Sequence, residues 1–573
     1  MIEQAILDKA QEWLNGNYDE ETKSAIRQMI DSDPQELTDS FYQSLTFGTG
    51  GMRGIMGPGT NRINKYTLGM ATQGLCNYMI ECFPGEELKV AIAFDCRNNS
   101  DTFARQVAEV FSANGIKVYL FESLRPTPEL SFTIRHLGCH SGIVLTASHN
   151  PKEYNGYKVY WNDGAQIVRP HDKLIIGEVE KITSPDQVKF EGNDELIEVI
   201  GAEVDEAFYE ASVSQGFDVG GKDTFKVVFT SIHGTSINGV PQVLERAGFQ
   251  NVYIVPEQAE PNGNFPTVVS PNPEEPEALS MAVALAEEKS ADMVIGTDPD
   301  SDRIGIAVRD HKDEIRLLNG NQTGAVMTDY LIEQWGKAGK LAGNEFIAST
   351  IVTSELFMDI AEANNLECPV CLTGFKWIAE LIREREGLKT FVGGGEESFG
   401  YMVGDFVRDK DAVTSALIAA EIAAEAQSRG SSFFERLLDV YIKYGFYKER
   451  LISIVKKGRD GATEIKAMME EYRNNPPVEI NGSKVVRMLD YGSLEEKNLV
   501  DGSTQAIDLP SSNVLQFYTE DGSKISARPS GTEPKIKFYF SVKGVLAGKE
   551  EFDSAEAGLD ERIDGIIDSM GLR

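Results

Sequence analysis

The stretch SGIVLTASHN, residues 141–150, decides the class of fold. It is an apolar, β-branched run that ends abruptly in polar, turn-forming residues. Runs of the same kind are LKVAIAFDCR (88–97), FKVVFTSIHG (225–234) and ADMVIGTDPDSDR (291–303). Unbroken apolar runs indicate strands buried on both faces, and the helical stretches between them indicate α/β sheets with parallel strands. Polar residues that follow such strands, here Ser148, His233 and Asp298, are expected at the edge of the sheet where ligands gather.

The chain of 573 residues is too long for one core, so several domains are expected. Connectors rich in glycine and acidic residues suggest boundaries around 213–225 and after the alanine-rich helical stretch 412–430. Beyond residue 430 helices mix with short alternating strands, which is typical of an α+β domain. We predict three similar α/β domains with mixed or parallel sheets and a smaller α+β C-terminal domain, with the ranges 1–207, 208–314, 315–430 and 431–573.

The composition is that of a globular protein, with 41% hydrophobic and 25% charged residues. A formal net charge of -35 argues against nucleic acid or an anionic membrane as partner, because both bind basic surfaces. The N-terminal stretch has helical spacing rather than the pattern of a signal peptide, and no run of about 18 apolar residues occurs. We therefore expect a cytoplasmic protein that acts on a small molecule.

The six cysteines are scattered and do not form a disulfide framework, which favours a reducing compartment. CPVC at 368–371 is a CxxC pair, but it lacks the second pair or nearby histidines that a zinc site needs. Structural cysteines are the favoured interpretation, with a redox or metal role as the alternative.

The sharpest local signal is GTDPDSDR, in which Asp298, Asp300 and Asp302 alternate directly after an apolar strand. Three converging carboxylates repel one another unless a cation lies between them, and oxygen ligands suit Mg²⁺. An EF-hand is excluded because Arg303 and Arg309 occupy places that need glycine and glutamate. An aspartyl-phosphate motif is disfavoured because Asp302 stands where threonine or valine belongs. A solvated acidic turn is the alternative.

A second signal is ARPSGTEPKIKFYF, residues 527–540. It offers a guanidinium, two hydroxyls and turn amides that together suit a phosphate dianion, from Arg528, Ser530, Gly531 and Thr532. Lys535 and Lys537 then alternate with apolar residues, so they share one face of a strand. A plain hairpin turn is the alternative.

Two glycine-rich stretches are weaker signals. GGGEESFG (393–400) places Glu396 and Ser398, groups that can bind sugar hydroxyls, on a backbone that a ligand can approach. FGTGGMRG (47–54) contains Arg53 but is not a Walker loop. Ser148 in TASHNP is also followed by turn-forming residues, so on local sequence alone an ordinary loop serine is an equal alternative.

Taken together and in this order, the motifs resemble those of the α-D-phosphohexomutase family, the phosphoglucomutases and phosphomannomutases, from about residue 40 to 540. The resemblance implies that Ser148 carries a phosphoryl group. It implies further that a Mg²⁺ ion is held by Ser148, Asp298, Asp300 and Asp302, with Arg303 beside the active site.

The remaining motifs receive roles from the same resemblance. GEES is similar to the sugar-binding loop, with Glu396 and Ser398 as readers of hydroxyls, and RPSGTEPK to the phosphate-binding loop of residues 528–532. Positions that the family keeps near the reacting groups are matched by Arg53, His149, Lys158 and Lys376. The family fold places its four domains around a central cleft.

One departure bears on the substrate. Bacterial phosphomannomutase/phosphoglucomutases usually read GExSGH at the sugar loop, whereas Phe399 and Gly400 stand here in place of Gly-His. The chain therefore looks more like the branch with phosphoglucomutases and phosphopentomutases, which argues against mannose phosphate. Because that histidine is missing, Lys376 or Lys158 is expected to be the acid/base group.

The activity implied is an intramolecular phosphotransferase of carbohydrate metabolism, an isomerase that interconverts sugar 1-phosphate and 6-phosphate, glucose above all. One Mg²⁺ per chain and glucose 1,6-bisphosphate as activator and intermediate are expected, in a monomer or homodimer. Phosphopentomutase or phosphomannomutase activity by the same mechanism is the alternative. A metal-dependent sugar phosphatase and a non-catalytic sugar-phosphate-binding protein are alternatives of other classes.

Overall fold

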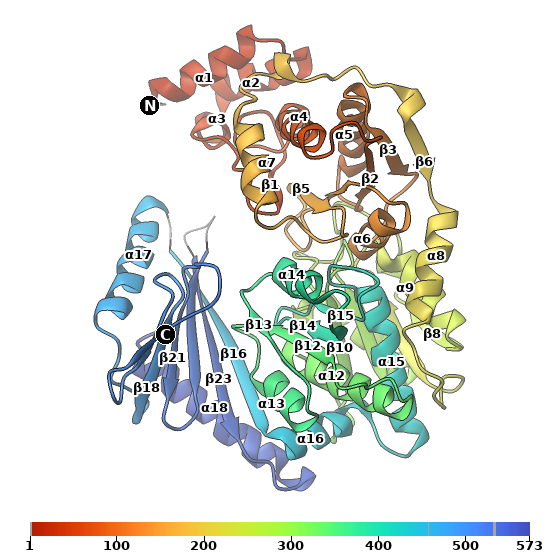
Figure 1. The fold of residues 1–573 in the computed structure, drawn as a ribbon, viewed down its shortest axis with the longest axis vertical. Coiled ribbons are helices and arrows are strands. Elements are labelled where there is room, and N and C mark those ends of the chain that lie inside the picture. Colours follow the sequence, from red (N-terminus) through yellow and green to blue (C-terminus); the bar gives the residue numbers. More distant parts are fainter. Residues whose placement is uncertain (1–2, 457, 531–534) are drawn as a thin grey trace. The chain divides into compact units, whose positions relative to one another are not determined.

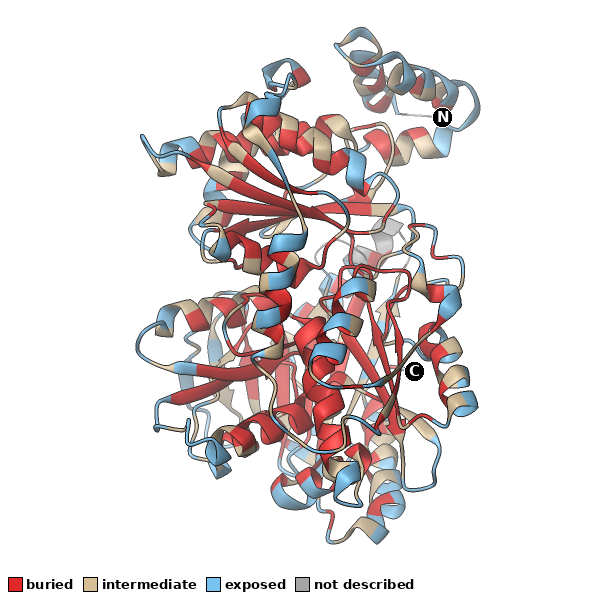
Figure 2. Ribbon diagram, turned by 90° about the vertical axis from the view of Figure 1, so that its right-hand side faces the viewer, coloured by how far each residue is buried: buried red, intermediate tan, exposed pale blue. Residues whose placement is uncertain are grey.

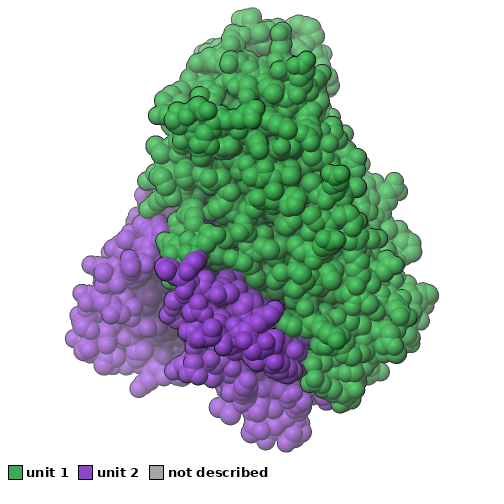
Figure 3. Space-filling model, turned by 45° about the vertical axis from the view of Figure 1, so that its right-hand side comes forward, with its two compact units in different colours: residues 1–319, 379–386, 398–430 green, residues 320–378, 387–397, 431–573 purple. Residues whose placement is uncertain are grey.

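The computed structural model describes residues 3–456, 458–530 and 535–573. The chain forms two compact units, coloured separately in Figure 3. Unit 1 contains residues 1–319, 379–386 and 398–430, and unit 2 contains residues 320–378, 387–397 and 431–573. Each unit is therefore assembled from separate stretches of the sequence.

The first sheet of unit 1 has six strands, and the strand predicted at 141–150 lies inside it. Figure 1 labels most of the strands of this sheet. Its order is β1 (Gly51–Ile55), β5 (Tyr154–Trp161), β4 (Ser141–Leu145), β2 (Lys89–Phe94), β3 (Lys117–Phe121) and β6 (Ile197–Ile200). β4, β2, β3 and β6 run parallel, whereas β5 is antiparallel to both β4 and β1. A short loop joins β4 to β5, and short loops allow only antiparallel pairing.

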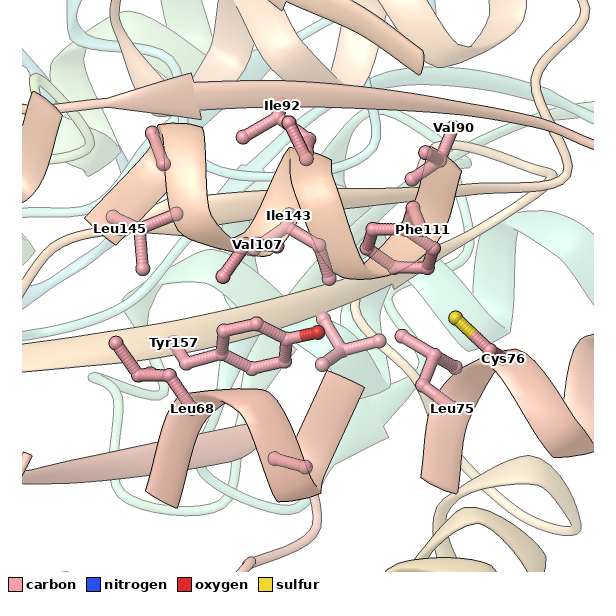
Figure 4. Packing of buried hydrophobic residues seen from close by; sticks show 14 of the residues in the cluster. Leu68, Leu75, Cys76, Val90, Ile92, Val107, Phe111, Ile143, Leu145 and Tyr157 are labelled. Carbon is pink, nitrogen blue, oxygen red and sulfur yellow. The ribbon is translucent and has the colours of Figure 1, made fainter. Parts of the chain in front are cut away.

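The core of this sheet follows from the alternation of its side chains. Val90 and Ile92 of β2 belong to one apolar cluster, and Ala91 and Ala93 belong to a second. Alternate residues of a strand face opposite sides of the sheet, so β2 is buried on both faces. Figure 4 shows part of the larger cluster, and Figure 2 shows the buried strands. The surrounding helices are α4 (Lys65–Cys82), α5 (Ser100–Ala113), α6 (Thr127–His136), α7 (His171–Glu180) and α8 (Ala202–Val213).

The second sheet of unit 1 has five strands. Its order is β11 (Ile315–Leu318), β10 (Ile304–Arg309), β9 (Met293–Thr297), β7 (Lys226–Thr230) and β8 (Asn251–Ile254). β9, β7 and β8 are parallel, and β10 and β11 complete an antiparallel meander. The helices of this region are α9 (Ser236–Arg246), α10 (Pro256–Ala259) and α11 (Pro276–Lys289).

Unit 1 has two further parts. At the N-terminus, α1 (Gln4–Asn15), α2 (Glu20–Ser32) and α3 (Pro34–Phe41) share an apolar cluster that includes Trp13 and Tyr66. The later stretch contributes β15 (Tyr401–Val403) and α15 (Ala412–Ser428). Asp411 caps α15, because its carboxylate accepts hydrogen bonds from the amides of Val413 and Thr414.

Unit 2 begins with parallel strands in the order β13 (Val370–Cys371), β12 (Glu345–Thr350) and β14 (Thr390–Gly395). Its helices here are α12 (Gly320–Lys337) and α13 (Leu356–Ala363), while α14 (Phe375–Arg385) passes from unit 2 into unit 1. An antiparallel sheet follows, made of β16 (Phe446–Val455), β23 (Lys535–Gly544), β22 (Lys524–Pro529), β21 (Leu515–Thr519), β18 (Ser483–Asp490), β19 (Glu495–Asn498) and β20 (Thr504–Ala506). Its companions are β17 (Glu479–Ile480), α16 (Phe433–Tyr444), α17 (Gly458–Asn474) and α18 (Phe552–Ser569).

The structure confirms the predicted fold class. All four apolar runs are strands, each shorter than the quoted run because the polar end is a loop, and the C-terminal part is rich in β structure. All six cysteines lie among the described residues, and none of them forms a disulfide bond there. Within the described chain, no helix is both long and apolar enough to span a bilayer. The boundaries at residues 207, 314 and 430 stay a prediction.

Candidate active site

Ser148 lies in the tight loop that follows β4. Its backbone φ is +53°, in the left-handed region that is uncommon for residues other than glycine. Its amide donates to the Thr146 hydroxyl at 2.8 Å, and that hydroxyl donates to the buried Asp95 at 2.7 Å. A strained conformation persists only when its surroundings fix it, and such strain clusters at functional sites.

Arg97 fixes this loop from within. Its two terminal nitrogens donate at 2.5–3.1 Å to four carbonyl oxygens of the loop, those of Ser148, Asn150, Pro151 and Tyr154. Its side chain is fully buried, with Asp95 3.3 Å away as its counter-ion. One planar guanidinium thus replaces the regular hydrogen bonding that the irregular loop lacks.

The acidic triplet forms a second tight loop at the end of β9. Ser301, at its tip, also has a positive φ of +59°. One oxygen of Asp298 accepts the amides of Asp302 and Arg303, each at 3.0 Å. The loop is also pressed against the end of β7, because a Cβ on Gly234 would lie only 2.6 Å from the Cα of Pro299. The three carboxylates are buried and converge, with ligand oxygens within 4.8 Å of one another.

The two loops meet at Ser148 and Asp298. The Ser148 hydroxyl donates to Oδ2 of Asp298 at 2.8 Å and lies 3.1 Å from Nδ1 of His149. Burial, followed by the charges of Asp300 and Asp302, raises the pKa of Asp298 well above its ordinary value. Burial and then the nearby guanidinium of Arg303 lower the pKa of His149 well below its ordinary value.

Two lysines balance part of the negative charge. Lys158 of β5 lies 2.6 Å from Oδ2 of Asp300 and 2.9 Å from Oδ2 of Asp302. Lys410, from the loop before α15, lies 3.2 Å from the same oxygen of Asp302. Burial disfavours the charged forms of Lys158 and Asp302, but their ion pairs have the larger effect. The pKa of Lys158 is therefore raised and that of Asp302 is lowered.

The aspartate cluster suits a hard divalent cation. Among the described residues, Oδ1 of Asp300 and Oδ1 of Asp302 accept no hydrogen bond although they are buried. Their other oxygens are occupied, since Thr127 donates to Oδ2 of Asp300 at 3.0 Å in addition to the lysines. Buried carboxylate oxygens without a donor are costly unless a cation binds them. The donor set therefore fits the Mg²⁺ that the sequence predicted.

Two arginines complete the cluster of predicted site residues in unit 1. Arg53 of β1 donates to the side-chain carbonyl of Asn150 at 2.9 Å. Arg303 forms an ion pair with Glu274, and its Nε lies 4.0 Å from Oδ1 of Asp302. Unit 1 therefore brings together Arg53, Ser148, His149, Lys158, Asp298, Asp300, Asp302 and Arg303.

Unit 2 contains most of the other predicted site residues. Glu396 is buried at the end of β14, and its carboxylate accepts a hydrogen bond from the Gly374 amide at 2.8 Å. Gly374 directly precedes α14, whose first turn contains Lys376. The unit boundary falls just after Glu397, so half-buried Ser398 belongs to unit 1.

The structure describes only part of the predicted phosphate-binding loop, residues 528–532. Arg528 near the end of β22 is paired in register with Lys537 of β23, which places two cations at one end of the hairpin. The Ser530 amide donates to the Lys535 carbonyl at 2.7 Å. The predictions for Gly531 and Thr532 lie outside the described residues.

Sequence reasoning missed Lys410 and Arg97. Lys410 stands in RDKD (408–411), where a lysine among acidic residues directly precedes an apolar helix. Arg97 follows Asp95 at the end of the first predicted strand, and a charged residue inside an apolar α/β region is itself a signal.

The comparisons with known proteins agree with this fold. Residues 44–186, 207–312 and 319–441 match α/β/α domains I, II and III of phosphoglucomutase/phosphomannomutase. A Staphylococcus aureus phosphoglucomutase is 38% identical over 542 residues, 94% of this chain and 96% of the relative. The Staphylococcus haemolyticus phosphoglucomutase is 36% identical over 505 residues, 88% of this chain and 91% of the relative.

Two solved structures share the fold. A putative phosphomannomutase from Thermus thermophilus has a TM-score of 0.68 at 20% identity, and covers 92% of this chain and 98% of its own. The open form of parafusin, a phosphoglucomutase from Paramecium, has a TM-score of 0.65 at 18% identity, with 92% and 96% covered.

Three α/β domains together with these similarities define the protein as a phosphohexomutase, an enzyme that moves a phosphoryl group within sugar phosphates. The chain belongs to the phosphoglucomutase/phosphomannomutase family.

Proposed function

We propose that this mutase interconverts glucose 1-phosphate and glucose 6-phosphate, with Ser148 as the residue that carries the phosphoryl group. The observation that carries the proposal is the hydroxyl of Ser148, 2.8 Å from Asp298 in a buried cluster of carboxylates and ammonium groups. The preference for glucose is supported by the phosphoglucomutase relatives and by Phe399 and Gly400 in the sugar loop.

The reaction needs two phosphoryl transfers. In the first, phosphorylated Ser148 gives its group to the 6-hydroxyl of glucose 1-phosphate: the bond from phosphorus to the sugar oxygen forms as the bond to Oγ breaks. The proton of the hydroxyl passes to a base. Despite burial, the ion pairs with Asp300 and Asp302 raise the pKa of Lys158, which disfavours the neutral amine that a base requires, so Lys376 is our candidate for this base. Phosphoryl transfer depends on positioning and charge neutralisation, which the lysines and arginines of the site supply.

The product of the first transfer, glucose 1,6-bisphosphate, then turns end for end. In the second transfer the bond from the 1-oxygen to phosphorus breaks as the bond from Oγ of Ser148 to phosphorus forms, the base returns its proton to the 1-oxygen, and glucose 6-phosphate leaves. We assign the reading of sugar hydroxyls to Glu396 and Ser398, and the holding of the distal phosphate to the 528–532 segment. The sugar offers similar hydroxyls to Glu396 and Ser398 before and after it turns, so the same contacts can hold it in both transfers.

We assign the Mg²⁺ ion, one per chain, to Asp298, Asp300, Asp302 and the oxygen of Ser148. When bound, the ion supplies positive charge that offsets the charge of the phosphoryl oxygens. The orphaned oxygens of Asp300 and Asp302 support this assignment. Glucose 1,6-bisphosphate would act as activator by phosphorylating Ser148 when this residue has lost its phosphoryl group.

The test is a panel of substrates. The protein receives Mg²⁺, a trace of glucose 1,6-bisphosphate, and glucose, mannose or ribose 1-phosphate in turn, and each product is followed together with inorganic phosphate. Rapid conversion of glucose 1-phosphate is expected, with Ser148 phosphorylated on intact-mass and peptide analysis. Full activity of Ser148→Ala would contradict the proposal, and sustained phosphate release would favour a phosphatase.

Two further expectations are part of the proposal. We place the enzyme in the cytoplasm, where its six free thiols stay reduced. We expect a monomer or homodimer, which light scattering distinguishes.

A further inference from the structure

Lys410 is held in a buried position that a lysine does not adopt unaided. Its side chain is only 13% exposed, and its ammonium lies 3.2 Å from Oδ2 of Asp302. Ordering such a long, flexible side chain costs conformational entropy. The side chain also passes directly over Gly400, where an added Cβ would lie 2.1 Å from its Cδ. Specific contacts must therefore fix its course.

Asp409 provides the first of these contacts. Its Oδ1 accepts a hydrogen bond from the Lys410 ammonium at 3.0 Å and another from the Lys410 backbone amide at 2.8 Å. The carboxylate thus holds both ends of the lysine. Asp409 is itself buried, with 3% of its surface exposed, so its other oxygen also needs a donor.

Tyr160 is that donor. Its hydroxyl donates to Oδ2 of Asp409 at 2.6 Å, and Tyr160 is completely buried. Tyr160 lies two residues after Lys158 on β5, so the two side chains leave the same face of the sheet. Without the hydroxyl, Oδ2 of Asp409 would be buried without a hydrogen-bond donor. This cost favours a different rotamer of Asp409, in which its contact with Lys410 is lost.

We propose that Tyr160 and Asp409 are positioning residues that hold the ammonium of Lys410 against the aspartate cluster. One strand thereby sets both ammonium groups: Lys158 directly, and Lys410 through the hydrogen bonds from Tyr160 to Asp409 and from Lys410 to Asp409. The kinetic consequence rests on the proposed function, because a displaced cation matters there for transfer of a charged phosphoryl group.

The variant is Tyr160→Phe, which removes one oxygen and keeps the packing of the ring. Its matched control is Tyr157→Phe on the same strand. The Tyr157 hydroxyl is also buried and has one partner, Thr72 at 3.1 Å, but it faces the apolar core (Figure 4). Equal thermal stability of the two variants would show that both remain folded.

The first readout does not depend on mutase activity. Trace acetylation with acetic anhydride, followed by peptide mass spectrometry, gives the reactivity of each lysine in the full-length protein. Tyr160→Phe and Asp409→Asn are expected to raise the labelling rate of Lys410 at least about threefold, because a released side chain spends more time in solvent. Tyr157→Phe is expected to leave the rate unchanged, and the same rate in all variants would overturn the proposal.

The second readout is kinetic. Tyr160→Phe is expected to lower kcat about three- to tenfold with KM for glucose 1-phosphate changed by less than about twofold. In a Lys410→Met background the same substitution is expected to have no further effect, because the group that it positions is gone. An equal loss of kcat with and without Lys410 would refute the positioning role. If the wild-type protein converts no sugar phosphate, the proposed function fails, and the labelling rates still decide whether Tyr160 and Asp409 hold Lys410.

Discussion

The hydroxyl of Ser148 donates a hydrogen bond to Asp298 at 2.8 Å, across 150 residues of sequence. A hydroxyl can lie against a carboxylate without penalty, but a phosphoserine cannot, because its dianion would face a carboxylate in a buried site. The phosphorylated enzyme therefore requires a cation at this point, and the orphaned oxygens of the neighbouring aspartates can bind it.

Asp298→Asn is expected to weaken divalent-metal binding at least about tenfold, because it removes one full charge from a site made of hard oxygen ligands. Binding of Mn²⁺, followed by its electron paramagnetic resonance signal, measures this directly. Asp292→Asn, at the start of the same strand, is the control and should bind the ion like the wild type. Unchanged affinity of the Asp298 variant would place the metal elsewhere.

Arg97→Lys is expected to lower kcat by about 10- to 100-fold and to reduce thermal stability. A lysine keeps the charge, but its three donors radiate from one nitrogen and cannot serve four carbonyls as the planar fork does. The extent of Ser148 phosphorylation by glucose 1,6-bisphosphate, measured by intact mass, should fall in parallel. Arg105→Lys on α5 is the control. Arg105 forms ion pairs with the surface carboxylates of Glu109 and Asp194, so this substitution should change neither kcat nor the extent of phosphorylation. Normal phosphorylation of the Arg97 variant would show that the loop holds its shape without the guanidinium.

Gly400→Ala is expected to push Lys410 away from Asp302, because the new Cβ would lie 2.1 Å from the lysine Cδ. The loss of kcat should be about as large as that caused by Lys410→Met when both variants are measured, with no additional loss when the two substitutions are combined. Gly558→Ala is the contrasting variant. It lies in helix α18 with open space around it, so it should raise stability by about 0.5–1 kcal/mol and leave kcat unchanged.

Asp411 predicts a pH dependence of stability. Burial raises its pKa from 3.8 to about 6, so the folded protein holds this proton more tightly than the unfolded chain does. The resulting stabilisation is complete below about pH 4 and is lost as the pH rises through about 6, a loss of about 3 kcal/mol for a shift of this size. Asp411→Asn keeps an oxygen to cap α15 and cannot ionise. Its melting temperature, relative to the wild type, should therefore rise between pH 4 and pH 7, and a constant difference would contradict the assignment.

The elements that sequence reasoning found are those that a local pattern specifies. Four strands are apolar on both faces, at residues 89–94, 141–145, 226–230 and 293–297. A surface helix is polar on its exposed face, so this composition indicates buried strands. The antiparallel strands β1, β5, β10 and β11 were not among the strands that the apolar runs predicted. β1, β5 and β11 contain more polar residues, whereas β10 is apolar and buried. β5, β10 and β11 each pair with the preceding strand through a short connection, and β1 pairs with β5, which is distant in the sequence.

Within the site, the residues found were those in compact motifs, such as Ser148 and the aspartates. Lys410 and Arg97 were missed because their partners lie far away in the chain, and no periodicity links a lysine before α15 to the end of β9. The structure brings the residues of unit 1 together, but the catalytic and binding roles of all the predicted site residues stay predictions.

The discontinuity of unit 1 also sets an order on synthesis. Ser148 and the aspartates leave the ribosome first, whereas Lys410 and the helix behind it come in the last stretch of the unit, residues 398–430. At about 5–20 residues per second, roughly 5–20 s separate Asp302 from Lys410. During that interval the nascent chain carries a crowded set of carboxylates with only part of its final cationic balance, so the unit cannot reach its native charge arrangement until most of the protein has been made.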